Sequence, residues 1–182
     1  MSRTDLAFSE VFGPLEGLVL THVASRADKG GDLGPGFALS CGYSPTMTIR
    51  FTAQVAGAYE HPEDECMSAG VSETEHGDGM VLTFQCCTYE PDDQDIALGF
   101  DTYCVVTANQ GTAYGAVQEL TLRDNVLRVV LDLDALEALG LTEPEIEAVL
   151  DVDEQSLERL RQGLRHILAY GRADARPRVL EL

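Results

Sequence analysis

The chain has 182 residues, 45 % of them hydrophobic, and this length and composition favour one folded domain over a disordered chain. Its 31 acidic and 12 basic residues give a formal net charge of −19, which argues against nucleic acid and anionic membranes as partners because both bind through Lys and Arg. No apolar stretch is long enough to cross a membrane and no signal peptide is recognisable, so we expect a cytoplasmic protein.

The first 46 residues differ in composition from the rest. They contain Gly and Pro at frequent intervals, and only the apolar stretch at residues 15–23 has the pattern of an ordered element. We expect residues 1–46 to be a weakly ordered extension, or sequence upstream of a true start at Met47. A single domain is expected over residues 47–171, followed by a loose C-terminal tail at residues 172–182.

Strand patterns follow one another after Met47. Alternating polar and apolar residues predict the first strand at residues 48–55. Further strands are expected at residues 66–73, 80–89, 101–108, 116–122 and 126–133, and a last one at residues 145–152. Because the connections are short, neighbouring strands are expected to pair as antiparallel hairpins.

The last third of the sequence predicts helices. A short helix is expected at residues 134–139, ended by Gly140. Asp153 is the predicted N-cap of a longer helix, whose apolar positions form one stripe. The stripe consists of Leu157, Leu160, Leu164, Ile167 and Leu168. The expected fold is therefore α+β: an antiparallel sheet of about six to seven strands with one main C-terminal amphipathic helix packed on it.

The four histidines and five cysteines offer little chemistry. Cys86 and Cys87 are adjacent and point to opposite faces of a strand, so we expect reduced, mostly buried thiols. His76 lies among acidic residues and one strand away from Cys66, so a small metal- or thiol-dependent enzyme remains an alternative function. The spacing matches no metal-ligand pattern, and the common catalytic motifs are absent. We therefore predict no enzyme activity, no catalytic residue, no metal and no cofactor.

The acidic residues are unevenly distributed. Neither Lys nor Arg occurs between Arg50 and Arg123. The acidic residues of that interval cluster in the loops that join the strands, next to several tyrosines: Glu60, Glu63, Asp64, Glu65, Glu73, Glu75, Asp78, Glu90, Asp92, Asp93, Asp95, Asp101 and Glu119. This pattern indicates either a solvated acidic face or a docking surface for a basic protein, in which carboxylates steer association and tyrosines act as anchors.

Two segments carry a family resemblance. Residues 96–104 read IALGFDTYC and residues 110–117 read QGTAYGAV, and together they resemble the signature of the Imm10 family of immunity proteins. Cys104 and Ala116 depart from it, where a second Tyr and a second Gly are typical. The resemblance covers residues 47–170 and implies a cytosolic antidote that covers or distorts the active site of a toxin. It also implies that Gly111 and Gly115 form turns.

The sequence thus predicts an immunity protein that binds and neutralises a cognate polymorphic toxin domain, expected to be basic. The two alternatives to an immunity protein are the small enzyme described above and a general acidic adaptor protein. The predicted partner-binding residues are Glu90, Asp92, Asp93, Asp95, Asp101, Tyr103 and Tyr114. For Asp101 and Tyr103 a structural role, as a buried carboxylate and its hydrogen-bond partner, competes with toxin contact. The oligomeric state is not indicated.

Overall fold

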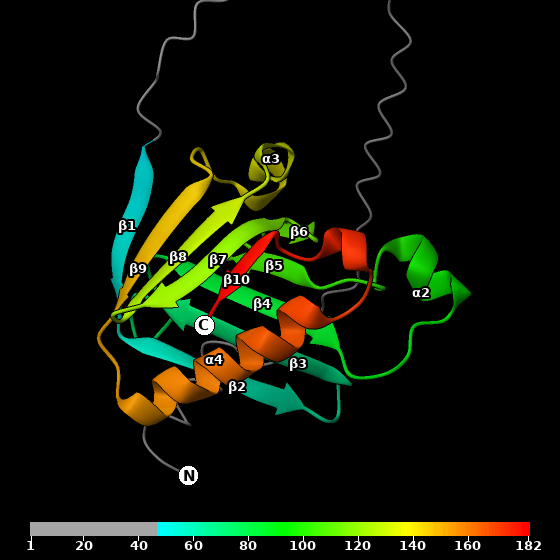
Figure 1. Cartoon of the computed structure of the whole chain (residues 1–182), viewed down its shortest axis with the longest axis horizontal. Coiled ribbons are helices and arrows are strands. Elements are labelled where there is room, and N and C mark those ends of the chain that lie inside the picture. Colours follow the sequence, from blue (N-terminus) through cyan, green and yellow to red (C-terminus); the bar gives the residue numbers. More distant parts are fainter. Residues whose placement is uncertain (1–46) are drawn as a thin grey trace, which may run out of the picture. The chain divides into compact units, whose positions relative to one another are not determined.

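The computed structural model describes residues 47–182. The predicted N-terminal extension at residues 1–46, and with it the question of a start at Met47, lies outside the described residues. Within residues 47–182 the chain forms two five-stranded sheets, one long helix and several short helical segments (Figure 1).

Sheet B, as we name the first one, consists of consecutive strands. Its members are β2 (Val55–His61), β3 (Cys66–Ser72), β4 (Val81–Cys87), β5 (Cys104–Thr107) and β6 (Thr112–Tyr114). They lie in chain order and every neighbouring pair is antiparallel, as expected from the short connections. The longest connection, between β4 and β5, contains the short helix α2 (Asp93–Leu98), where the sequence analysis expected only a polar loop.

Sheet A combines strands from distant parts of the chain. Its order is β1 (Thr48–Ala53), β9 (Glu145–Leu150), β8 (Val126–Leu131), β7 (Val117–Arg123) and β10 (Val179–Glu181). The β7–β8–β9 part is antiparallel, whereas β1 pairs with β9 and β10 pairs with β7 in parallel. The segment at residues 172–182, expected to be a loose tail, therefore contains an edge strand and the 3-10 turn η2 (Ala173–Ala175).

The predicted α+β class is confirmed, but the prediction of one sheet with six to seven strands is wrong. The strand expected at residues 48–55 is divided at Gln54, and the chain passes there from sheet A into sheet B. Each sheet therefore has its own edge strands, and the parallel pairs that complete sheet A join segments far apart in the sequence.

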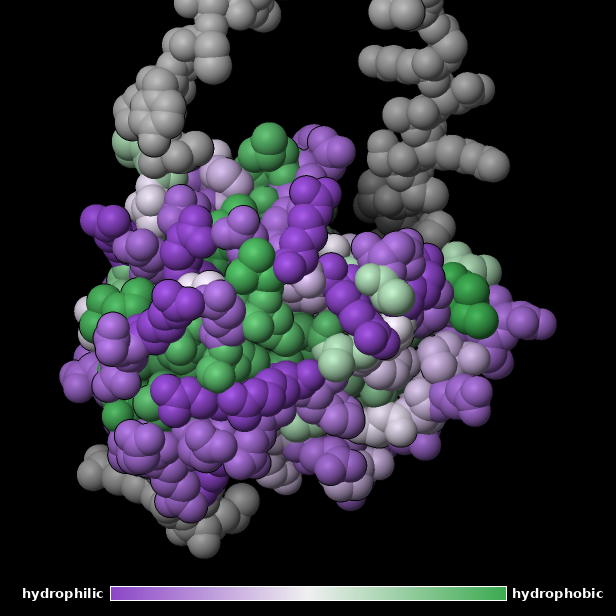
Figure 2. All heavy atoms as spheres, in the orientation of Figure 1, coloured by the Kyte–Doolittle hydropathy of each residue, from purple (hydrophilic) through white to green (hydrophobic). Residues whose placement is uncertain are grey.

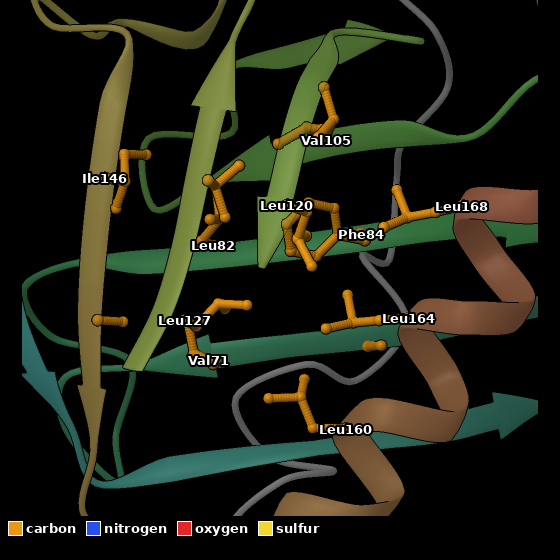
Figure 3. Packing of buried hydrophobic residues seen from close by; sticks show 14 of the residues in the cluster. Val71, Leu82, Phe84, Val105, Leu120, Leu127, Ile146, Leu160, Leu164 and Leu168 are labelled. Atoms are coloured by element: carbon orange, nitrogen blue, oxygen red, sulfur yellow. The ribbon is translucent and has the colours of Figure 1, made fainter. Parts of the chain in front are cut away.

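The core lies between the two sheets and the helix α4 (Glu154–Ala169). Figure 3 shows Leu82 and Phe84 of β4 pointing toward Leu120 of β7, with Leu160 and Leu164 of α4 closing the side of this interior. Each of these side chains is fully buried. Since apolar area removed from water stabilises a fold by about 25 cal/mol per Å², this shared interior holds both sheets and α4 together.

The helix α4 confirms its predicted pattern. Asp153 caps it by accepting a hydrogen bond of 2.9 Å from the Ser156 N–H, and the five predicted apolar positions are buried. Gly163 lies against Ala58 of β2 and Ala69 of β3, where a Cβ atom would overlap the Ala58 Cβ and lie 2.9 Å from the Ala69 Cβ. A residue without a side chain is thus what lets α4 approach sheet B so closely.

A second short helical region follows β8. The 3-10 turn η1 (Leu133–Ala135) leads into α3 (Leu136–Leu139), and Gly140 ends it in the left-handed conformation with a φ of 65°. The predicted short helix and its glycine stop are both confirmed.

Candidate partner-binding surface

Two acidic segments meet at one end of sheet B. The β2–β3 turn contains Glu63, Asp64 and Glu65, and it lies at the end of the sheet where β4 ends and the connection to β5 begins (Figure 1). The Thr88 N–H donates a hydrogen bond of 2.9 Å to the carbonyl oxygen of Glu65, which joins the two segments directly. We call the following set the acidic end of sheet B: Glu63, Asp64, Glu65, Glu90, Asp92, Asp93 and Asp95.

The carboxylates of the acidic end are accessible. All of them belong to exposed residues except Asp95, which is partly buried. In sheet A, by contrast, carboxylates face arginines: Arg50 contacts Glu147 at 2.7 Å and Arg128 contacts Glu145 at 2.6 Å. Such pairing offsets the negative charge on the outer side of sheet A. The segments that carry the acidic end contain no Lys or Arg of their own.

The helix α2 fixes part of this surface. Asp92 caps it by accepting hydrogen bonds from the N–H groups of Gln94 and Asp95, at 2.8 and 2.9 Å, and the Asp95 carboxylate accepts one from the Asp92 N–H at 3.2 Å. This reciprocal capping box explains why the six residues of α2, two of them aspartates, form a helix directly after Asp92. Gly99 ends α2 with a φ of 88°. Asp92 and Asp95 therefore have a structural role in addition to their charge.

Exposed apolar side chains accompany these carboxylates. Tyr59 of β2 is 41 % exposed, Tyr89 just after β4 is 36 % exposed and Ile96 of α2 is 48 % exposed. Figure 2 shows mostly hydrophilic side chains around α2, at the right of the view, with apolar side chains among them. Amphipathic rings surrounded by charge are typical of protein interfaces. The contact residues predicted from the sequence include none of these three, although Tyr59 and Tyr89 are among the tyrosines that lie next to the acidic residues in the sequence. Exposure follows from the fold and not from residue type.

Asp101 lies near the acidic end but has a partner. Its Oδ2 lies 3.5 Å from Nε of Arg172, and its carbonyl oxygen accepts a hydrogen bond of 3.1 Å from the Arg172 N–H. The Asp101 side chain is only 13 % exposed. Gly171 passes so close to the Asp101 backbone that no Cβ atom would fit. These contacts hold the segment that follows α4 against the start of β5.

Tyr103 is fully buried. Its hydroxyl accepts a hydrogen bond of 3.1 Å from the Val117 N–H and lies 3.5 Å from the Val117 carbonyl oxygen. Burial raises the pKa of Tyr103 to about 12. In this fold Tyr103 has no surface with which to touch a partner, and its hydrogen-bond partner is the backbone of β7 and not Asp101.

Tyr114 is half-buried and lies on β6. Its ring packs against Phe100 with a centroid distance of 6.0 Å, and burial is the main cause that raises its pKa to about 12. Phe100 follows α2, so this contact joins β6 to the connection that carries the acidic residues. Of the two tyrosines selected from the sequence, Tyr114 alone presents part of its surface.

The two motif glycines act differently. Gly115 adopts a φ of 59° and allows the turn between β6 and β7, as expected. Gly111 lies where a Cβ atom would be 2.7 Å from the Ala138 carbonyl oxygen, so it permits close packing of the β5–β6 turn against α3.

The residues of the enzyme alternative do not come together. Cys66 begins β3, whereas His76 lies in the turn beyond its far end, about 20 Å away for a seven-residue strand. Burial raises the pKa of Cys66 to about 11, so its thiol stays protonated at neutral pH. No group of three His, Cys, Asp or Glu side chains among residues 47–182 is arranged to hold a metal ion.

Comparisons with known proteins agree with the motif. A family model described as Immunity protein 10 matches residues 52–158, which include β2 to β9 and the acidic end. Neither a curated protein nor a solved structure matches the chain. Over residues 47–182 the structure contains no helix that is both long and apolar enough to cross a membrane.

Proposed function

The chain belongs to the Immunity protein 10 family, and on this premise we propose that it binds a cognate toxin domain and neutralises it by protein–protein contact in the cytoplasm. The mechanism is stoichiometric binding that covers or distorts the active site of the toxin. Catalysis by this chain has no part in it.

The observation that supports the proposed binding mode is the gathering of exposed carboxylates at the acidic end of sheet B. Negative charges held close together attract a basic partner at long range and speed its encounter. Tyr59, Tyr89 and Ile96 supply apolar surface at the same place, where short-range contact is made. A toxin domain with a basic surface around its active site fits both features. We place Asp101 and Tyr114 at the margin of this surface.

The test uses four substitutions that leave the capping of α2 intact. Glu63→Gln, Asp64→Asn, Glu90→Gln and Asp93→Asn are combined in one variant, while Asp92 and Asp95 are kept because they cap the helix. A matched control removes the same charge from exposed carboxylates elsewhere: Glu75→Gln, Asp78→Asn, Glu137→Gln and Asp151→Asn. Both variants have the same net charge, so they differ only in where negative charge was lost.

Association with the cognate toxin domain, which is to be sought among the neighbouring genes, is measured by stopped flow at several salt concentrations. We expect the association rate of the test variant to fall about tenfold at low ionic strength, with a flatter salt dependence than the control. Equal rates and equal salt dependence in the two variants would remove the acidic end as the docking surface. Co-expression tests neutralisation itself: cells that express the toxin domain and the wild-type chain survive, and a complex can be isolated.

A further inference from the structure

Two cysteines face each other across neighbouring strands. Cys66 of β3 is the register partner of Cys87 of β4 in the antiparallel sheet B, both are partly buried, and both are free thiols. Partners in an antiparallel pair differ in spacing, depending on whether they exchange backbone hydrogen bonds. Whether these two sulfurs can bond therefore depends on which kind of pair they form.

Two backbone hydrogen bonds at the ends of the β3–β4 pair show which residue pairs of these strands are hydrogen-bonded. The Glu73 N–H donates to the Met80 carbonyl oxygen at 2.8 Å, and the Thr88 N–H donates to the Glu65 carbonyl oxygen at 2.9 Å. Glu73 and Met80 continue the β3–β4 register at one end, and Glu65 and Thr88 continue it at the other, so each of these pairs is a hydrogen-bonded pair. Along an antiparallel pair of strands, hydrogen-bonded pairs alternate with non-hydrogen-bonded ones. Cys66 and Cys87, one step inside Glu65 and Thr88, are thus a non-hydrogen-bonded pair.

That geometry suits a disulfide. The Cα atoms of a non-hydrogen-bonded pair lie about 4.5 Å apart, within the range of roughly 4.4–6.8 Å that disulfides require. The neighbouring pair of the same kind, Ser68 and Gln85, shows that side chains on this face reach one another. The Gln85 amide donates to the Ser68 hydroxyl at 3.1 Å.

The other described cysteines, Cys86 and Cys104, are less well placed to form a disulfide. Cys86 points into the core and is 4 % exposed, on the face opposite to Cys87. Cys104 of β5 is 9 % exposed and has Gln85 as its register partner, not a cysteine. Among residues 47–182, Cys66 and Cys87 are the cysteines that sit directly opposite each other.

We propose that Cys66 and Cys87 are a modification site, at which a low-molecular-weight disulfide such as oxidised glutathione converts them to an intramolecular disulfide. One protein sulfur attacks the oxidised glutathione, forms a mixed disulfide and releases one reduced glutathione. The second protein sulfur attacks the first, the mixed disulfide breaks and the second glutathione leaves. Two protein thiols are oxidised and one glutathione disulfide is reduced to two thiols, which take up the two protons. Because the high pKa of Cys66 limits its thiolate, the reaction accelerates as the pH rises.

The bond would lie directly beside the acidic end. Glu65 precedes Cys66 and Thr88 follows Cys87, so the crosslink would tie together the two segments that carry the exposed carboxylates. The inference depends only on the register of sheet B and is independent of the proposed function.

The experiment treats the reduced, folded full chain with oxidised glutathione, blocks the remaining thiols with an alkylating reagent and maps the peptides by mass spectrometry. We expect the protein to lose two hydrogens, with Cys66 and Cys87 in one crosslinked peptide pair and Cys86 and Cys104 alkylated only after denaturation. The melting temperature of the oxidised wild type shifts upward by several degrees, because the crosslink restricts the unfolded chain.

Variants identify the sulfurs. C66S and C87S each abolish the intramolecular bond and the rise in melting temperature, whereas C104A keeps both. A stable glutathione adduct without a crosslink, a crosslink that uses Cys41, Cys86 or Cys104, or a crosslink that forms only in denaturant would each overturn the proposal. If a variant fails to fold, the peptide map of the wild type still decides between these outcomes.

Discussion

Replacing Tyr103 with Phe tests whether this motif residue stabilises the fold or contacts the toxin. The ring remains, so the apolar burial of the fully enclosed side chain is unchanged. The hydroxyl is lost, and the Val117 N–H that donates to it at 3.1 Å becomes a buried donor without its partner. An unsatisfied buried donor costs about 1–3 kcal/mol. Since a domain has only about 5–15 kcal/mol of stability, this loss is easily measured.

The assay is equilibrium unfolding in urea, followed by circular dichroism. We expect Tyr103→Phe to lower the free energy of unfolding by about 1–3 kcal/mol with an unchanged denaturant slope. Tyr114→Phe is the matched control, because Tyr114 is only partly buried and its hydroxyl has no protein hydrogen-bond partner comparable to Val117 within residues 47–182. This substitution should change stability by less than about 0.5 kcal/mol. Folded Tyr103→Phe should bind toxin as tightly as the wild type. Equal stability of the two variants, or lost toxin binding without lost stability, would refute this reasoning.

Three further changes test the packing and the titrating groups. Gly163→Ala should lower the free energy of unfolding in urea by about 1–2 kcal/mol, because overlap with Ala58 outweighs a gain of about 1 kcal/mol in helix propensity. Adding Ala58→Gly should restore part of this loss. A double variant no more stable than Gly163→Ala would contradict the overlap. Asp153→Ala should cost about 1 kcal/mol at neutral pH, and because capping lowers the pKa of this carboxyl below its ordinary 3.8, the difference from wild type should shrink as the pH falls through that value. Burial raises the pKa of Tyr103 from 10.0 and that of Cys104 from 9.0, each to about 12. Because these groups ionise at lower pH in the unfolded chain, the free energy of unfolding should fall from about pH 9 upward. A free energy of unfolding that stays constant up to pH 12 would show that these groups are not buried.

Local features of the fold were readable from the sequence. The hairpin of β7 and β8 has Asp124 and Asn125 at its turn, with φ values of 48° and 60°, and these are residue types that tolerate the left-handed conformation. The apolar stripe and the Asp153 cap of α4 follow from a period of 3.6 residues. Each of these signals lies within one short segment of the chain.

Other features depend on contacts that no short segment contains. The sequence alternates without a break through Gln54, so the passage between the two sheets cannot be seen in the pattern. The capping box of Asp92 and Asp95 was present in the sequence, and its three-residue spacing would have predicted α2 instead of a loop. Tyr103 and Tyr114 lie in one motif, and only the packing distinguishes the buried residue from the half-exposed one.

The parallel pairing of β1 with β9 sets an order of assembly. Arg50 and Glu147, which bridge the two strands, are 97 residues apart, whereas sheet B needs only the chain between residues 55 and 114. Because closing a long loop is slow, hairpins near the ribosome exit can form well before β1 finds its neighbour. A growing chain would then expose the apolar side of sheet B until the last third emerges to cover it. Completion of the core therefore waits for the C-terminal third of the chain, and a nascent chain stalled before β9 would leave its first strand without a place in the fold.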